Sequence, residues 1–189
     1  MKYLSYLLIF IGIICCSFAA YFTWLRNDPN RLSFKEYQPA KVVTAKEKSL
    51  PQRIIISDLH VNLPVVPSKI TNNVWETNNN GASYLISSPL PGEKGNSIIY
   101  AHNWASLFGN LVSAKPGQKV EVVYADGSHK NFYIEYTSTV SPSEASILAP
   151  SKDQRITLYT CTGWFDTHRF VAVAVLDTGK PSFAKVDKL

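Results

Sequence analysis

The sequence predicts an all-β domain, a small closed eight-stranded β-barrel with one or two short helices, preceded by an N-terminal transmembrane helix. Short β-branched runs bounded by Pro, Asp and Asn recur from residue 51 onward, among them RIIIS, NSIIYAH, KVEVVY and RFVAVAVL. About eight such runs fall within roughly 130 residues with little helix between them, which is typical of small barrels. Upstream of them, residues 4–25 include no charged residue and no histidine.

The uncharged run predicts the membrane helix. It is 22 residues long, and at about 1.5 Å per residue it reaches about 33 Å, enough to cross a hydrocarbon core of about 30 Å. A cleaved signal peptide is the alternative, with residues 17–19 (SFA) as its cleavage site. The length of the run and the aromatic residues Tyr21, Phe22 and Trp24 at its end favour an uncleaved anchor over residues 1–25.

The rest of the chain divides into three parts. Residues 26–50 are polar and charged and are predicted to form a spacer, residues 51–178 form the barrel domain, and residues 179–189 form a polar tail without a second membrane span. The net charge is +5 and the pI is 9.0. Because the basic residues are scattered, no nucleic-acid site is predicted, and attraction to an anionic cell surface is the milder interpretation.

Within the barrel domain, local patterns justify individual elements. The Asp-Gly pair in ADGS predicts a tight hairpin turn before His129. Alternation then predicts half-buried strands, with one row formed by Phe132, Ile134 and Tyr136 and another by Phe170, Ala172, Ala174 and Leu176. Helical spacing appears only in NWASLFGNLVSA and, after a Pro, in SPSEASIL.

A single cysteine of the domain requires an explanation. Cys15 and Cys16 lie within the predicted anchor, so Cys161 has no partner for a disulfide inside the domain. A buried cysteine that acts as a small apolar residue is one interpretation. However, Cys161 ends an apolar strand and precedes the loop TGWFDTH, which predicts a position at a barrel rim, where a reactive thiol would be accessible.

A nucleophilic thiol needs a cationic or proton-transferring neighbour and a donor that stabilises an oxyanion. Of the four histidines, His60 and His129 are expected to be solvated or structural. His168 adjoins Arg169, and in an alternating strand the two side chains point to opposite faces. His102 is the best candidate, because it ends the strand NSIIYAH as Cys161 ends its own strand.

These residues lie in motifs that resemble the sortase family. ITLYTC resembles the T-L-x-T-C signature of sortases, SPLPGEKGNSIIYAHN the approach to their histidine, KPGQKVEVVY a strand entered through a Pro-Gly turn, and RFVAVAVL their arginine-bearing final strand. The resemblance covers about residues 53–176, with the motifs in the family's order of His, Cys and Arg. It implies a sortase-like barrel and a cysteine transpeptidase.

The resemblance implies a reaction and its catalytic residues. Cys161 would attack the Thr carbonyl of a C-terminal Leu-Pro-x-Thr-Gly sorting motif in a secreted protein and form a thioester. His102 would protonate the departing amine and deprotonate the incoming one. Arg169 would hold the substrate backbone or the oxyanion.

Further expectations follow from the same resemblance. Thr160, Asn103 and Trp104 would support substrate or oxyanion binding, and no cofactor and no metal are expected. The partners would be secreted proteins with a sorting signal and an amine of a cell-wall precursor or a pilin. The protein would be a single-pass protein of the cell membrane with its catalytic domain outside. The region before the barrel lacks an Asp-Pro-aromatic lid motif of pilin-polymerising sortases.

Two other functions stay open. An L,D-transpeptidase is also a β-rich wall enzyme, but its cysteine normally follows a Ser-His-Gly approach rather than Leu158-Tyr159-Thr160. A catalytically silent surface module that binds peptides is the second. A papain-like protease is disfavoured, because its cysteine precedes its histidine in the chain.

Overall fold

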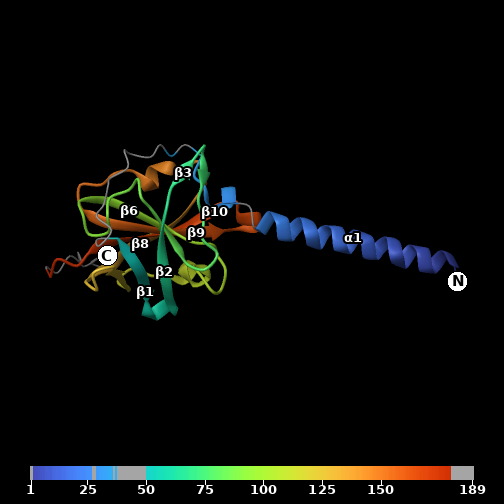
Figure 1. Ribbon diagram of the computed structural model, residues 1–189, viewed down its shortest axis with the longest axis horizontal. Helices are drawn as coiled ribbons and strands as arrows, with labels where there is room; N and C mark the ends of the chain where they lie inside the picture. Colours follow the sequence, from blue (N-terminus) through green and yellow to red (C-terminus); the bar gives the residue numbers. More distant parts are fainter. Residues whose placement is uncertain (1, 27–28, 36, 38–49, 180–189) are drawn as a thin grey trace, which may run out of the picture.

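The structure is a computed structural model that describes residues 2–26, 29–35, 37 and 50–179. Helix α1 (Lys2–Arg26) projects away from a β-barrel, and its C-terminal end meets the barrel beside β9 and β10 (Figure 1). Residues Tyr3–Leu25 of this helix are long and apolar enough to cross a membrane, and none of the span is buried against the domain. The expected tail lies outside the described residues from residue 180 onward, as do residues 38–49 of the expected spacer.

Eight strands close the barrel, which confirms the predicted fold class. In chain order they are β1 (Pro51–Ile56), β2 (Val61–Ser68), β5 (Ala82–Leu85), β6 (Gly95–Tyr100), β7 (Lys119–Tyr124), β8 (His129–Val140), β9 (Gln154–Thr162) and β10 (His168–Leu176). Around the barrel they run β1-β2-β5-β6-β9-β10-β8-β7, and β7 pairs with β1 to close it. All neighbours are antiparallel except β2 with β5 and β6 with β9.

The connections between strands range from tight turns to the longer segments 101–118 and 141–153. They include the two-stranded hairpin of β3 (Ile70–Thr71) and β4 (Val74–Trp75) and 3₁₀ turns η1 (Pro29–Leu32), η3 (Ser57–Leu59), η4 (Gly109–Ser113), η5 (Ala145–Leu148) and η6 (Trp164–Asp166). The two regions with helical spacing thus contain 3₁₀ turns rather than α-helices. At the predicted hairpin turn, Gly127 has φ of +81° and Asp126 accepts hydrogen bonds from the backbone and the hydroxyl of Ser128.

The predicted alternation fails at one position. Phe132 and Ile134 are fully buried inside the barrel, but Tyr136 is 37% exposed. The pairing of β8 with β10 shifts between Val173 and Ala174, so that Tyr136 faces Val173 and Glu135 is left as a bulge. One extra residue in a strand reverses the faces that follow it.

Apolar residues fill the barrel and also cover part of its outside. The interior contains Ile156 and Leu158 of β9 and Ala172 and Ala174 of β10, as the alternation predicts. The residues between them point outward and are nevertheless buried. They belong to a second group, here called the outer cluster, whose buried members are Leu32, Phe34, Trp75, Leu85, Ile98, Tyr100, Val140, Leu148, Tyr159, Cys161, Val171 and Val173. The site is built on this outer face.

Candidate active site

Strand register pairs two of the predicted catalytic residues, and the third follows a neighbouring strand. Cys161 of β9 lies directly opposite Arg169 of β10 in the antiparallel ladder. On its other side β9 runs parallel to β6, with Tyr100 beside Tyr159. The rings of these two tyrosines stack with their centroids 5.3 Å apart. His102 follows two residues after Tyr100, and Cys161 follows two residues after Tyr159, so both lie just past this pair at the same end of the barrel.

His102 is held in a tightly wound loop after β6. Its side chain is 5% exposed, and its ring stacks on that of Trp104 at a centroid distance of 4.7 Å. The backbone N–H of Phe108 donates to the His102 carbonyl at 3.0 Å, and that of Gly109 donates to the Trp104 carbonyl at 2.9 Å. A Cβ on Gly109 would lie 2.7 Å from the Trp104 carbonyl oxygen, so this close winding requires glycine.

Arg169 is a buried cation with one unsatisfied donor. It is 3% exposed, and its guanidinium donates to the carbonyls of Asp166, His168 and Ser33 at 2.9 to 3.0 Å. Its Nε–H has no hydrogen-bond partner among the described residues. Because a buried unsatisfied charged donor is costly, this atom is suited to bind an acceptor brought by a ligand. His168 is exposed, as the alternation at Arg169 predicts.

The three expected supporting residues differ in their placement. Trp104 contacts His102 directly. Asn103 is exposed, and its side-chain amide donates to the Asp166 carboxylate at 3.3 Å. Thr160 points to the opposite face from Cys161 and donates to the Ala101 carbonyl at 2.8 Å. This hydrogen bond joins β9 to the segment that leads into His102.

A segment that the sequence analysis treated as a spacer covers the thiol. Residues 29–35, here called the strap, lie against the end of β9. Cys161 Sγ donates to the Arg31 carbonyl at 2.8 Å, and the Tyr159 hydroxyl donates to the Leu32 carbonyl at 2.9 Å. The strap continues with Lys35 N–H, which donates to the Pro142 carbonyl. The strap thus covers the thiol, although this region lacks the Asp-Pro-aromatic lid motif.

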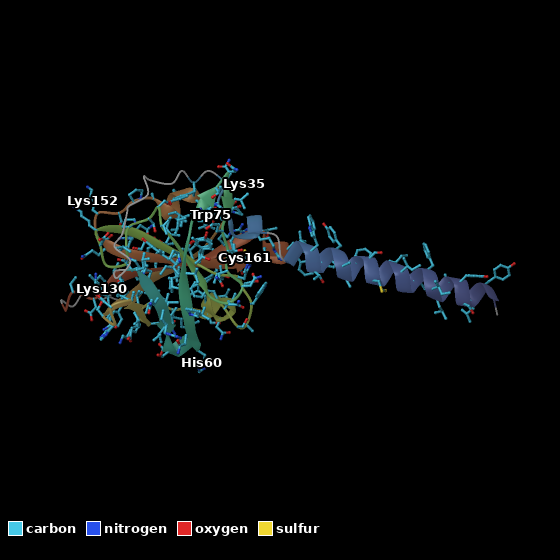
Figure 2. The ribbon with its side chains drawn as sticks, viewed as in Figure 1. Lys35, His60, Trp75, Lys130, Lys152 and Cys161 are labelled. Carbon is cyan, nitrogen blue, oxygen red and sulfur yellow. The ribbon has the colours of Figure 1, made fainter. Side chains whose placement is uncertain are left out.

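Two apolar side chains attach the strap to the outer cluster. Leu32 is fully buried and Phe34 is 3% exposed. The Phe34 ring meets the edge of Tyr159 at a centroid distance of 5.1 Å and lies 6.5 Å from the ring of Trp75. Trp75 comes from β4, and Figure 2 shows it beside the part of the barrel that carries Cys161. The strap therefore occupies an aromatic groove on the outside of β6 and β9.

An ion pair joins the strap to the loop between β9 and β10. The Arg31 guanidinium contacts the Asp166 carboxylate, and both side chains are largely buried, at 19% and 9% exposed. Neither residue was singled out by motif. Their only sequence signal is that Leu32 and Phe34 are large apolar residues near Arg31 in an otherwise polar stretch.

The strap and the barrel together hold the thiol in its protonated form. Burial raises the pKa of Cys161 from its ordinary value of 9.0 to about 12, against the opposing charge of Arg169. Asp166 adds to the increase and Arg31 lowers the pKa slightly. With the strap in place Cys161 is 2% exposed and its thiol is un-ionised at neutral pH, so this is a closed form of the site.

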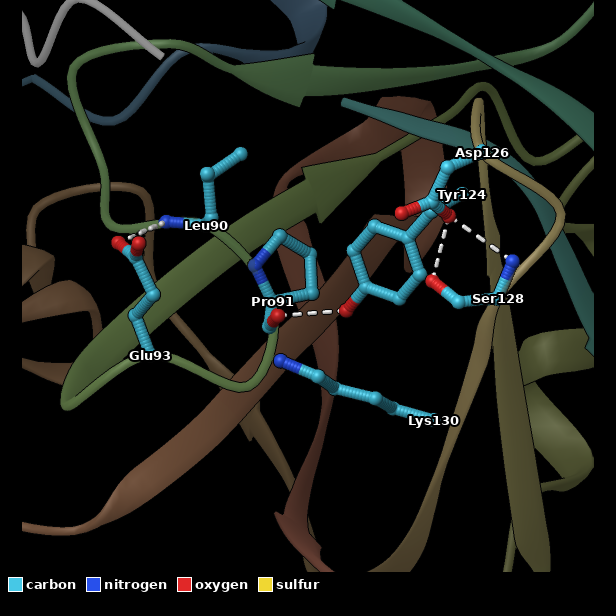
Figure 3. A pocket seen from close by; sticks show the side chains of 7 residues that line it. All are labelled: Leu90, Pro91, Glu93, Tyr124, Asp126, Ser128 and Lys130. Atoms are coloured by element: carbon cyan, nitrogen blue, oxygen red, sulfur yellow. Dashed lines mark hydrogen bonds between the residues drawn. The ribbon is translucent and has the colours of Figure 1, made fainter. Parts of the chain in front are cut away.

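A second hollow lies elsewhere on the barrel and contains none of the predicted catalytic residues. It measures about 190 Å³ and lies at Leu90, Pro91, Glu93, Tyr124, Asp126, Ser128 and Lys130 (Figure 3). Its polar groups bind one another: the Tyr124 hydroxyl donates to Pro91, and Ser128 donates to Asp126. Figure 2 shows Lys130 on the side of the barrel away from Cys161.

Comparison with known proteins agrees with the geometry. The Sortase domain family matches residues 54–177. Sortase A of Listeria monocytogenes serovar 1/2a is 31% identical over 128 residues, which cover 66% of this chain and 55% of that protein. The chain thus matches little more than half the length of this relative.

Solved structures give the same fold. Sortase A of Listeria monocytogenes has a TM-score of 0.56 at 30% identity, covering 68% of this chain and 88% of that one. Sortase C-1 of Actinomyces oris has a TM-score of 0.62 at 23% identity, covering 87% of this chain and 98% of that one. Sortase A of Corynebacterium diphtheriae has a TM-score of 0.61 at 22% identity, covering 87% of this chain and 83% of that one. The last two support the fold alone.

Proposed function

We propose a catalytic role from one premise: this chain belongs to the sortase family, whose domain spans residues 54–177. The proposed reaction is transpeptidation. The enzyme cleaves a C-terminal sorting motif of the Leu-Pro-x-Thr-Gly type between Thr and Gly and passes the acyl group to an amine at the cell surface. The observation that carries the proposal is the pairing of Cys161 with Arg169 beside the end of β6, the strand that leads into His102.

The first step is acylation of the thiol. The Arg31 carbonyl oxygen lies 2.8 Å from Sγ, in the space that a substrate carbonyl needs, so the strap has to move before substrate binds. Its departure exposes the sulfur to water and removes part of the desolvation that raises the thiol pKa. The thiol then gives its proton to His102, the thiolate attacks the Thr carbonyl carbon, and the C–N bond to Gly breaks as the thioester forms.

His102 handles the protons of both half-reactions. As imidazolium it gives a proton to the departing Gly amine, and as neutral imidazole it takes one from the incoming amine before that amine attacks the thioester. Stacking on Trp104 fixes the plane of the ring, and the Phe108 N–H fixes the backbone of His102. A ring fixed on two sides loses little freedom when the transition state forms.

Arg169 stabilises negative charge on the reacting carbonyl oxygen. Support comes from its burial and from the Nε–H that lacks an acceptor in the closed form. The donor that now reaches the Ser33 carbonyl is also released when the strap leaves. A buried guanidinium with two free donors can bind an oxyanion with charge-assisted hydrogen bonds.

The apolar helix provides the proposed location. A 23-residue span, Tyr3–Leu25, anchors the chain in the cell membrane as a single pass with the barrel outside. The substrates are then secreted proteins with a sorting signal, and the acceptor is an amine of a cell-wall precursor or a pilin.

The test uses the full chain in detergent micelles with a Leu-Pro-x-Thr-Gly peptide and a primary amine. We expect mass spectrometry to detect a thioester on Cys161 and a ligated peptide, and neither product with Cys161→Ala. Saturable binding without an adduct would point to a silent peptide-binding module. Cross-linking of wall tetrapeptides instead of the sorting peptide would point to an L,D-transpeptidase.

A further inference from the structure

The loop between the cysteine strand and the arginine strand exposes two large aromatic side chains. Trp164 is 81% exposed and Phe165 is 54% exposed, and their rings meet edge to face at a centroid distance of 5.6 Å. They lie within η6, three and four residues beyond Cys161. Adjacent exposed aromatic residues on a loop are unusual in water and mark an interaction surface.

The position of this loop relative to helix α1 identifies the partner. The Phe165 ring stacks on that of Phe22 at a centroid distance of 5.7 Å and an interplanar angle of 11°. Phe22 belongs to the span Tyr3–Leu25 that is apolar enough to cross a membrane. Figure 1 shows the same meeting of the helix end with the β9 and β10 end of the barrel.

The depth of Phe22 can be worked out from helix geometry. It lies eight residues from the middle of the span, which is about 12 Å along the axis at about 1.5 Å per residue. The half-thickness of a hydrocarbon core is about 15 Å. Phe22, and Phe165 stacked on it, therefore lie near the boundary between hydrocarbon and headgroups. Tyr21 and Trp24 lie on the same stretch of the helix and are both more than half exposed, as in an interfacial aromatic belt.

The loop backbone is fixed in the conformation that presents these rings. Phe165 and Asp166 have φ of +53° and +57°, a region that residues with side chains rarely adopt. Such conformations persist where the surroundings fix them, and Asp166 is held by Arg31 and by Asn103. The ion pair with Arg31 also neutralises the carboxylate beside the rings, which reduces repulsion from anionic lipids.

We propose that Trp164 and Phe165 form a membrane-docking element that inserts into the lipid interface and holds the mouth of the site against the membrane surface. The proposal rests on the membrane anchoring proposed above. The partner is a lipid bilayer, which the stacking on Phe22 favours over a peptide. Docking holds Cys161, which lies three residues before Trp164, close to the lipid headgroups. The thiol is then within reach of reactants that are themselves held in the membrane.

Tryptophan fluorescence of the full chain in vesicles tests the proposal. The chain contains four tryptophans, and Trp24→Phe removes the one in the helix. Lipids brominated near the headgroup end of the acyl chain quench only rings that enter the interface. In the Trp24→Phe background three tryptophans remain, and only Trp164 is expected to enter the interface. We therefore expect the brominated lipids to quench roughly one third of the emission. Adding Trp164→Phe should abolish this loss, whereas adding Trp104→Phe should preserve it.

Three results would overturn the proposal, and flotation with vesicles distinguishes its failure from failure of the proposed anchoring. Chains that float with vesicles but show equal fractional quenching with and without Trp164→Phe would retain the anchor and reject docking. Chains that do not float would reject both. If Trp164 instead contacts the sorting peptide, Trp164→Phe would raise KM for a soluble peptide in detergent and leave quenching unchanged, which also rejects docking.

Discussion

Release of the strap can be measured through the reactivity of the thiol that it covers. Phe34→Ala removes a ring that is 3% exposed and packs against Tyr159 and Trp75. Truncation of a buried Phe costs about 3–5 kcal/mol in a core, and we take about 3 kcal/mol, since a short segment relaxes more easily than a core. At about 1.4 kcal/mol per tenfold, the open fraction should rise by about 10²-fold.

The assay is alkylation of Cys161 by iodoacetamide in the full chain. Cys15→Ala and Cys16→Ala leave Cys161 as the single thiol. If only the open form reacts, the rate is the open fraction multiplied by the rate of an accessible thiol, and Phe34→Ala should raise it by about two orders of magnitude. The free energy of unfolding of the barrel should change much less, because the strap leaves before the barrel opens.

A matched control distinguishes strap release from unfolding. Phe132→Leu perturbs a fully buried residue inside the barrel that belongs to the other apolar group. It should lower the free energy of unfolding and leave alkylation nearly unchanged. The reasoning is refuted if Phe34→Ala alkylates at the rate of the parent chain, or if Phe132→Leu accelerates alkylation equally.

Three further predictions concern the site itself. The thiol pKa is about 12 in the closed form against an ordinary 9.0, so closure is favoured below pH 9.0 and loses that advantage as the pH rises toward 12. Alkylation through the open form should therefore keep rising above pH 9.0, because ionisation of the accessible thiol increases the open fraction, whereas a rate that levels off near pH 9.0 would mean that closure does not raise the thiol pKa. Arg169→Lys should lose most ligation activity with an unchanged circular dichroism spectrum, because one ammonium cannot replace the planar fork; near-normal ligation would remove Arg169 from the mechanism. Gly109→Ala should lower kcat by about tenfold or more, because its Cβ would contact the Trp104 carbonyl and displace the loop that holds His102; an unchanged kcat would show that this loop tolerates the shift.

Local sequence predicts the barrel and singles out the candidate catalytic residues. Strands such as NSIIYAH and RITLYTC are short apolar runs with polar ends, and the residues of interest stand where the runs end. Local sequence does not predict which strands pair with each other. That β6 lies parallel to β9, and so leads His102 to the same end of the barrel as Cys161, depends on contacts between segments about 60 residues apart. Only the family resemblance anticipated that neighbourhood.

The strap could not be predicted, for a physical reason. Residues 26–50 are polar on average, and two apolar residues at positions 32 and 34 give no periodic signal. Their burial depends on an apolar outer face that Tyr100, Tyr159 and Trp75 build from three separate segments. Alternation predicts outward residues of a barrel to be solvated, so the buried outward face of β9 runs against the pattern.

Closure by a tethered segment also predicts how the proposed reaction depends on the concentration of the sorting peptide. The strap follows helix α1 after two residues, so it stays near the thiol at a high effective concentration even when it is released. A sorting peptide binds only the open form, and its apparent affinity is therefore lowered by the open fraction. Phe34→Ala should then lower KM for the peptide by up to the factor by which it accelerates alkylation, while kcat stays constant because Cys161, His102 and Arg169 are intact. A change in kcat with constant KM would mean instead that Phe34 helps to shape the groove during catalysis, and strap release would no longer account for the effect.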